Sequence, residues 1–214
     1  MARISAAMVA RSRGVAESRW SPGGTHLAWL DSFDGRTDVL VAPADGSGPA
    51  VVATADVAVT GAGVYGGGVF AWAGDDALVV AADDGRLLLL DAGGGPARVL
   101  STGGRAFAPA VSPDSSQVAF CLERNDSCDI AVVRLDGSSW PVRVSEGADF
   151  SWDPCWSPDG RTVAWHEWDH PDMPWDSSRI VAREIGAAPE GPVRVVAGET
   201  ASPPASPDSR PAVI

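Results

Sequence analysis

The ten-residue stretch WSPDGRTVAW, residues 156–165, decides the fold because close copies of it recur along the chain. SPGG begins at Ser21, SPDS at Ser112 and a further SPDS at Ser206. The proline of each copy ends a strand or opens a turn, because its φ is fixed and it donates no backbone N–H. The residues after it, Asp-Gly in the quoted copy, favour the turn that returns the chain antiparallel to itself. Each copy therefore predicts a tight turn followed by a short β-strand.

The copies are spaced like the repeats of a propeller. With a degenerate copy at Trp72, the repeats start near positions 21, 72, 112, 157 and 206, about 51, 40, 45 and 49 residues apart. Two further apolar runs and a Gly-rich turn follow in each unit, which makes four short antiparallel strands. We therefore expect an all-β fold, a β-propeller of about four four-stranded blades plus the start of a fifth.

The repeat register also predicts the limits of the blades. The expected order is an N-terminal lead at 1–14 and a partial propeller at 15–214, with blades at about 15–54, 64–102, 105–145, 148–197 and a truncated fifth at 200–214. Aligned on its SPDS, Ile214 falls where Trp165 falls in the fourth blade, so the last blade stops inside its second strand. An incomplete propeller leaves an unpaired edge. We therefore expect a piece of a longer protein or a truncated reading frame.

Charge and composition exclude some partners. The 214 residues carry a net charge of −12 and no cluster of basic residues. Nucleic acids and anionic membranes both require a basic footprint, so neither is an expected partner. The acidity itself is most simply explained by solubility.

The cysteines and the N-terminus indicate a compartment. Cys121, Cys128 and Cys155 are odd in number and lack C-x-x-C spacing, which favours free thiols in a reducing environment. The apolar run Ala6–Ala10 is shorter than the roughly 7 residues that a signal peptide needs. No stretch reaches the roughly 20 apolar residues of a membrane span. The sequence therefore predicts a cytoplasmic location.

The segment HEWDHPDMPW, residues 166–175, occurs once and contains the HExxH pattern of zinc peptidases. In those enzymes both histidines lie on one helical face. Here the repeat places His166 at the end of a strand, which separates it from His170 by about 13 Å, and Pro171 and Pro174 oppose a helix. We therefore predict no metal site and no cofactor.

The same segment is a candidate binding loop. A loop between the second and third strands of a blade lies on the same face as the link between blades, and Tyr65 belongs to such a link. Long loops with aromatic and acidic residues suit domain docking or the lining of an access path; the alternative is that both tryptophans pack between blades. The repeated Trp20, Trp29, Trp156 and Trp165 are expected in the inter-blade core. The candidate docking or substrate-binding residues are Tyr65, Glu167, Trp168, Asp169, His170, Met173 and Trp175.

Three stretches resemble one family. Residues 161–176, RTVAWHEWDHPDMPWD, are similar to the LAWxxWDHPxMPWD segment in the propeller of prolyl oligopeptidase-like serine peptidases, in the acylaminoacyl-peptidase and dipeptidyl-aminopeptidase branch. Residues 65–68, YGGG, resemble that branch's HEYGGG segment, and residues 147–150 lead into the fourth blade as in its members. Gly63 and Val64 replace the His-Glu pair of HEYGGG, so that pair's role does not carry over. The resemblance covers roughly residues 20–208.

The resemblance implies a non-catalytic domain. In this family an N-terminal propeller caps an α/β-hydrolase domain, restricts access to small peptides and leaves the chemistry to a Ser-Asp-His triad on a G-x-S-x-G elbow. This chain contains no G-x-S-x-G, so it has no predicted catalytic residue and should be inactive alone. The implied partners are a hydrolase domain, missing from this chain, and small peptides. The alternative is a stand-alone propeller of the Tol type that acts as a protein-interaction scaffold.

Overall fold

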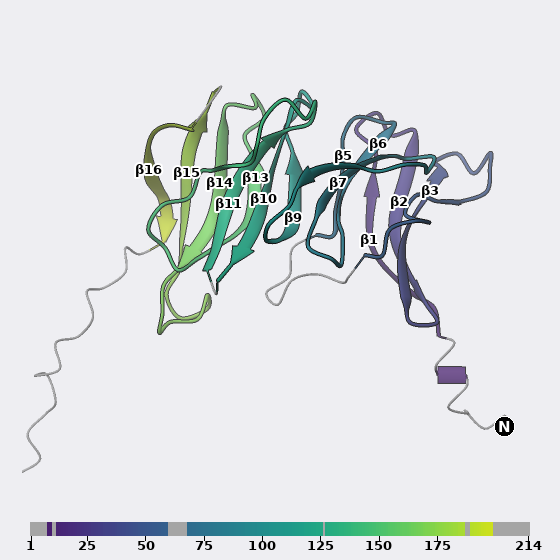
Figure 1. Cartoon of the computed structure of the whole chain (residues 1–214), viewed down its shortest axis with the longest axis horizontal. Coiled ribbons are helices and arrows are strands. Elements are labelled where there is room, and N and C mark those ends of the chain that lie inside the picture. The colour runs from purple at the N-terminus through teal and green to yellow at the C-terminus, as the bar shows by residue number, and fades with distance from the viewer. Residues whose placement is uncertain (1–7, 10–11, 60–67, 126, 187–188, 199–214) are drawn as a thin grey trace, which may run out of the picture.

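The computed structural model describes residues 8–9, 12–59, 68–125, 127–186 and 189–198, and it confirms the predicted all-β propeller fold (Figure 1). Sixteen strands occur in this part of the chain. The expected fifth repeat at 200–214 and the candidate Tyr65 lie outside the described residues. No helix in the described ranges is long and apolar enough to cross a membrane.

Two separate four-stranded antiparallel sheets come first, and in each the strands are ordered as in the sequence. We call them blade 1 and blade 2. Blade 1 consists of β1 (Gly14–Trp20), β2 (His26–Phe33), β3 (Arg36–Pro43) and β4 (Val51–Val52). Blade 2 consists of β5 (Phe70–Trp72), β6 (Ala77–Ala81), β7 (Leu87–Asp91) and β8 (Arg98–Ser101).

The next eight strands form one hydrogen-bonded sheet with two halves, blade 3 and blade 4. The halves are joined by a parallel bridge between Cys128 of β11 and Phe150 of β13. Blade 3 consists of β9 (Arg105–Val111), β10 (Gln117–Arg124), β11 (Ser127–Arg134) and β12 (Val142–Arg143). Blade 4 consists of β13 (Phe150–Trp156), β14 (Thr162–Trp168), β15 (Arg179–Ile185) and β16 (Pro189–Gly198).

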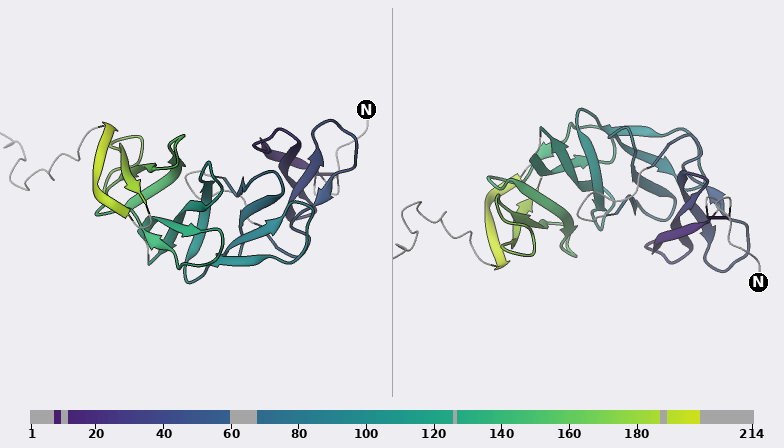
Figure 2. Two further views of the ribbon diagram at one scale, coloured as in Figure 1. Left: turned by 90° about the horizontal axis from the view of Figure 1, so that it is seen from above. Right: turned by 90° about the horizontal axis from the view of Figure 1, so that it is seen from below.

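The four blades follow one another along an open arc from β1–β4 to β13–β16 (Figure 2). The first strand β9 contacts both β5 and β13, so the inner strands of neighbouring blades meet. Three apolar clusters fill the interfaces between blades, and each draws its residues from neighbouring blades. The hydrophobic core is therefore a series of inter-blade layers, as expected for stacked sheets.

The serine of the repeated motif closes the turn that the proline opens. The Ser112 hydroxyl oxygen accepts the Gln117 N–H at 3.0 Å, and the Ser157 hydroxyl accepts the Thr162 N–H at 3.0 Å. Ser21 makes the same contact in blade 1. A side-chain acceptor at this position replaces a backbone partner and stabilises the turn. The motif thus determines where each second strand begins.

Tryptophans of the first strands join neighbouring blades. The Trp72 indole Nε1 donates to the Arg19 carbonyl at 3.0 Å, and the Trp156 Nε1 donates to the Ala110 carbonyl at 2.9 Å. The two acceptors stand at the same repeat position of the preceding blade. Trp20 is instead 60% exposed, because no blade precedes blade 1 in the described part of the chain. The predicted core position is therefore wrong for Trp20.

The second strands show the same effect of position in the arc. Phe120 and Trp165 occupy equivalent repeat positions, face the preceding blade and are 0% and 1% exposed. Trp29 stands at that position in blade 1 and is only half-buried. The prediction of an inter-blade core is thus confirmed for Trp165. Trp29 is less buried because no described blade covers its face of blade 1.

Candidate functional site

The candidate loop, residues 169–178, connects β14 to β15 and projects from the lower edge of the arc in Figure 1. The β2–β3 turn lies at the same edge, because both are connections between second and third strands. The turns between first and second strands lie at the opposite edge. Loops on one edge of a rigid scaffold are common positions for binding sites.

Glu167, at the base of the loop, is buried in a hydrogen-bonded ion pair. Its side chain is 3% exposed and its Oε1 accepts from Arg179 Nε at 2.7 Å. Its Oε2 accepts from Trp165 Nε1 at 2.9 Å. A buried carboxylate requires such partners to offset its desolvation. Glu167 therefore stabilises the base of the loop and does not face an incoming ligand.

Asp169 and His170 continue this network. Arg179 also donates to Asp169 at 3.1 Å, Asp169 accepts the Asp149 N–H at 3.0 Å, and the Asp149 carboxylate accepts the His170 N–H at 2.9 Å. Burial lowers the pKa of Arg179, but its hydrogen bonds and charge interactions with Glu167 and Asp169 outweigh burial and raise the pKa above its ordinary value. The first residues of the loop are therefore held on the blade by charge-assisted bonds.

Trp168 and Trp175 have opposite environments although both were predicted site residues. Trp168 is 1% exposed and stacks on Phe150 with ring centroids 5.1 Å apart, while His170 packs edge-on against the same phenyl ring at 4.9 Å. Trp175 is 72% exposed. The structure thus places Trp168 in the core of blade 4 and leaves Trp175 on the surface.

The far end of the loop is a tight turn that presents Trp175. The Met173 carbonyl accepts the Asp176 N–H at 2.9 Å, and Met173 itself is half-buried. An exposed tryptophan on an ordered turn offers a large contact area at low entropic cost. Among the predicted residues that the structure describes, Trp175 has the geometry most suited to contact with a partner.

The HExxH pattern lies on a strand. His166 and Glu167 belong to β14, and Glu167 already pairs with Arg179. Burial lowers the pKa of His166, and the nearby charge of Asp153 opposes that shift only in part. No group of three His, Cys, Asp or Glu side chains in the described ranges has the arrangement of a metal site. His166 and Glu167 thus lie on a strand and His170 in the loop after it, and the segment does not form the helix on which such zinc ligands stand.

Arg179 is the important residue that sequence reasoning missed. It lies directly opposite Glu167 in the antiparallel pairing of β14 with β15. Opposite charges at directly paired positions stabilise a sheet. The pairing of the two residues could be predicted only if the register of β14 with β15 were known. The sequence does not give that register, because the loop between the two strands is long.

Comparisons with known proteins agree with this fold. No family model matches the sequence, and no curated protein matches it. Among solved structures, a puromycin-hydrolyzing peptidase of Mycobacterium tuberculosis superposes with a TM-score of 0.74 at 25% identity, over 93% of this chain and 33% of that one. A puromycin hydrolase gives the same score and identity over 93% of this chain and 35% of its own.

Two more distant structures share the fold alone. A structure from a study of two prolyl endopeptidases has a TM-score of 0.62 at 15% identity, over 89% of this chain and 30% of its own. TolB from Acinetobacter baumannii has a TM-score of 0.61 at 15% identity, over 88% and 44%. The resemblance predicted from residues 161–176 is therefore confirmed: the chain has the fold of the propeller portion of prolyl oligopeptidase-type peptidases and spans about a third of the length of those it matches.

Proposed function

We propose that this chain is the propeller portion of a prolyl oligopeptidase-type serine peptidase and that it gates or positions small peptides for a hydrolase domain. The observation that carries the proposal is the superposition of 93% of the chain on a peptidase named for puromycin hydrolysis, at 25% identity. The 214 residues contain no G-x-S-x-G elbow, so the nucleophile would come from another segment or chain.

The loop at 169–178 is the proposed contact. Trp175, 72% exposed, would pack against the hydrolase domain or the peptide, while the Glu167–Arg179 pair keeps the loop base in one position. A residue that holds the substrate away from the reacting bond can raise the reaction rate, because a misplaced substrate reacts far more slowly. In this proposal no residue of the chain takes part in bond making. We further propose a reducing compartment, which suits three free cysteines.

The test begins with the DNA that follows the coding region. A continuing frame with G-x-S-x-G and a later histidine would supply the expected domain, and the complete polypeptide should then cleave aminoacyl p-nitroanilides.

In that polypeptide Trp175→Ala should lower kcat/KM by about tenfold, because one aromatic anchor of the contact is lost. Trp140→Ala is the matched control, since Trp140 is 82% exposed on the β11–β12 turn at the opposite edge. Equal effects of the two changes would contradict the loop assignment.

The second candidate is a stand-alone interaction scaffold, favoured by the similarity of the fold to TolB. It predicts that the purified chain unfolds cooperatively and binds a protein partner without any hydrolase domain. The peptidase proposal predicts aggregation or a broad melt, because the Trp20 and Trp29 face of blade 1 is uncovered. A thermal melt combined with light scattering distinguishes them.

A further inference from the structure

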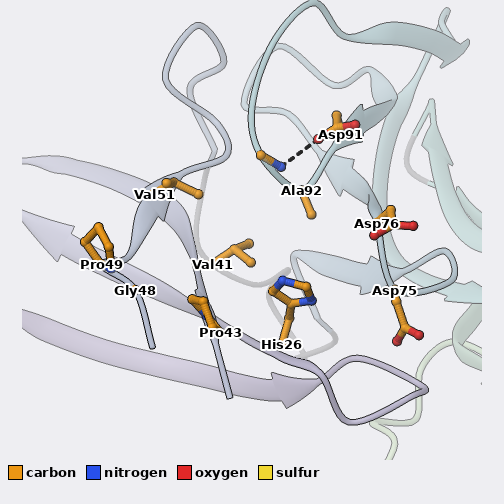
Figure 3. A pocket seen from close by; sticks show the side chains of 11 residues that line it. His26, Val41, Pro43, Gly48, Pro49, Val51, Asp75, Asp76, Asp91 and Ala92 are labelled. Carbon is orange, nitrogen blue, oxygen red and sulfur yellow. Dashed lines mark hydrogen bonds between the residues drawn. The ribbon is translucent and has the colours of Figure 1, made fainter. Parts of the chain in front are cut away.

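A cavity of about 580 Å³ opens between blade 1 and blade 2 (Figure 3). It lies at the edge formed by the turns between first and second strands and between third and fourth strands, opposite the 169–178 loop. Its volume is within the roughly 300–1,000 Å³ range typical of small-molecule sites. It is separate from the loop of the proposed function.

The internal repeat provides a second wedge with which this cavity can be compared. The equivalent wedge between blades 3 and 4 has a volume of about 50 Å³. Ala92 follows β7 in blade 2, and Ile185 occupies the equivalent position at the end of β15 in blade 4. Each lines its own wedge and each is 6% exposed. The alanine methyl thus leaves more space at this point of the first wedge than the larger isoleucine side chain leaves in the second.

One wall of the open wedge is apolar. Val41 and Val51 pair across β3 and β4 and line the cavity together with Pro43 and Pro49. The Ala92 methyl points into the cavity from the facing blade (Figure 3). The closed wedge has valines at the equivalent paired positions, Val132 and Val142, so an apolar wall belongs to the repeat. The space left by Ala92 is therefore a place for an apolar group.

The facing wall from blade 2 is negatively charged. Asp75, Asp76 and Asp91 line it, and no arginine does so among the described residues. The Asp75 Oδ1 accepts the Gly23 N–H at 2.7 Å, which lowers the pKa of Asp75 together with bonding to Ser21 and the charge of His26. Asp76 is exposed and has no ion pair in the part of the chain described. Asp75, Asp76 and Asp91 thus form no salt bridge with an arginine within the described ranges.

His26 projects between the two walls (Figure 3). Its Nδ1 is 3.0 Å from the Thr25 hydroxyl, and its ring lies 6.4 Å from that of the buried Trp72. The hydrogen bond orients the imidazole and leaves Nε2 for another partner. The closed wedge has Gln117 at this repeat position. The Asp91 Oδ1 accepts the Gly93 N–H at 2.7 Å (Figure 3). The open wedge therefore combines an apolar cleft, an oriented imidazole and three carboxylates that form no salt bridge with an arginine in the described ranges.

We propose that this wedge binds a small organic cation, an ammonium or guanidinium group carried on an apolar body. The apolar body lies between Val41, Val51 and Ala92, and the cationic group faces Asp76 and Asp91. An anion is opposed by the carboxylates, and a neutral apolar molecule leaves them without a partner. The proposal stands on this wedge alone and does not depend on a hydrolase domain.

Phenethylamine is the probe, and 2-phenylethanol is its uncharged counterpart. Titration of the full chain, followed by calorimetry and by the NMR signals of the His26 ring, should show saturable binding of the amine. The alcohol should bind at least about tenfold more weakly, the loss of about 1.4 kcal/mol of charge interaction. Absence of saturable amine binding, or equal binding of the alcohol, overturns the proposal.

Two variants locate the binding in the wedge. Ala92→Ile places in the cleft the side chain that stands at the equivalent position of the other wedge, and by occupying the site of the apolar body it should weaken amine binding at least about tenfold. Asp76→Asn removes an exposed carboxylate without loss of an ion pair and should weaken binding about threefold to tenfold. Ile185→Val, a matched change in the closed wedge, should leave amine binding unchanged. Unaltered binding in both Ala92→Ile and Asp76→Asn refutes the site, and the exposed Asp76 variant keeps the test decisive if the isoleucine variant fails to fold.

Discussion

The blade 1–blade 2 interface and the blade 3–blade 4 interface are built from the same repeat but differ at their rims. In the first, Ala92 lines a cavity of about 580 Å³; in the second, Ile185 lines a wedge of about 50 Å³. The second interface also contains the buried Glu167–Arg179 pair. The equivalent positions thus carry a small side chain in the open wedge and a large one in the narrow wedge. Interfaces built from one repeat can therefore differ in how much space their rims enclose.

The largest effect is expected from removal of the Glu167–Arg179 ion pair at the blade 3–blade 4 interface. Glu167→Ala leaves Arg179, 16% exposed, without its main partner and opens a gap beside Trp165. We expect a loss of about 3–5 kcal/mol in the free energy of unfolding, because Arg179 keeps only Asp169 as a charged partner and the buried Trp165 indole N–H loses its acceptor. Urea unfolding followed by tryptophan fluorescence measures it.

Asp31 is the control for that change. It occupies the Glu167 position in blade 1 and pairs with Arg13, whose side chain is 60% exposed. A solvent-exposed arginine loses little when its partner is removed, so Asp31→Ala should cost about 0–1 kcal/mol. Equal losses in the two variants would show that the preceding blade does not determine the strength of the pair.

Ile185→Ala should enlarge the narrow wedge between blade 3 and blade 4. Ile185 is 6% exposed and packs in the cluster between blades 3 and 4. Truncation of a buried isoleucine costs about 2–5 kcal/mol through lost burial and the cavity left behind. Denaturant unfolding gives the cost, and a crystal structure gives the cavity volume. A loss below about 0.5 kcal/mol would mean that the wedge collapses or was never filled.

The reverse change should have a smaller effect. Ala92→Ile adds apolar surface where space is already present, so we expect a gain of up to about 1 kcal/mol in stability. Comparison of midpoints for wild type and variant in urea measures it. A loss of more than about 1 kcal/mol would indicate overpacking and would contradict the cavity.

The smallest effect concerns pH at the open interface. The pKa of Asp75 is lowered by the Gly23 N–H, by Ser21 and by His26. A lowered pKa in the folded state adds stability above the unfolded value of about 3.9, and this contribution disappears as pH falls through the still lower folded value. Asp75→Asn should therefore be less stable than wild type at about pH 6, and the difference should shrink by about pH 3. A difference that persists in acid would rule out this linkage.

The fold was predictable because its signals are local. The Ser-Pro turn, the Asp-Gly pair and the apolar runs of β10 and β14 each specify strand or turn within a few residues. Their spacing then indicates blades, since four short strands recur between copies. Burial was less predictable, because Trp29 and Trp165 share one motif and differ only in whether a blade precedes them.

The candidate sites were harder to predict, because they depend on contacts between residues that lie apart in the sequence. Trp168 and Trp175 occur in a single motif, yet one continues the strand into the core and the other follows a turn after two prolines. Arg179 required the register across the loop. The cavity at Ala92 required comparison of positions in different repeats, followed by knowledge of which residues face each other across an interface.

The indole hydrogen bonds from Trp72 to Arg19 and from Trp156 to Ala110 have a consequence for the shape of the arc. Each bond ties the first strand of one blade to that of the preceding blade at the same repeat position. Blade 3 has Val111 at the position of these tryptophans, so its junction with blade 2 relies on other contacts. The arc is thus held by contacts that are local to each junction, and these differ from one junction to the next.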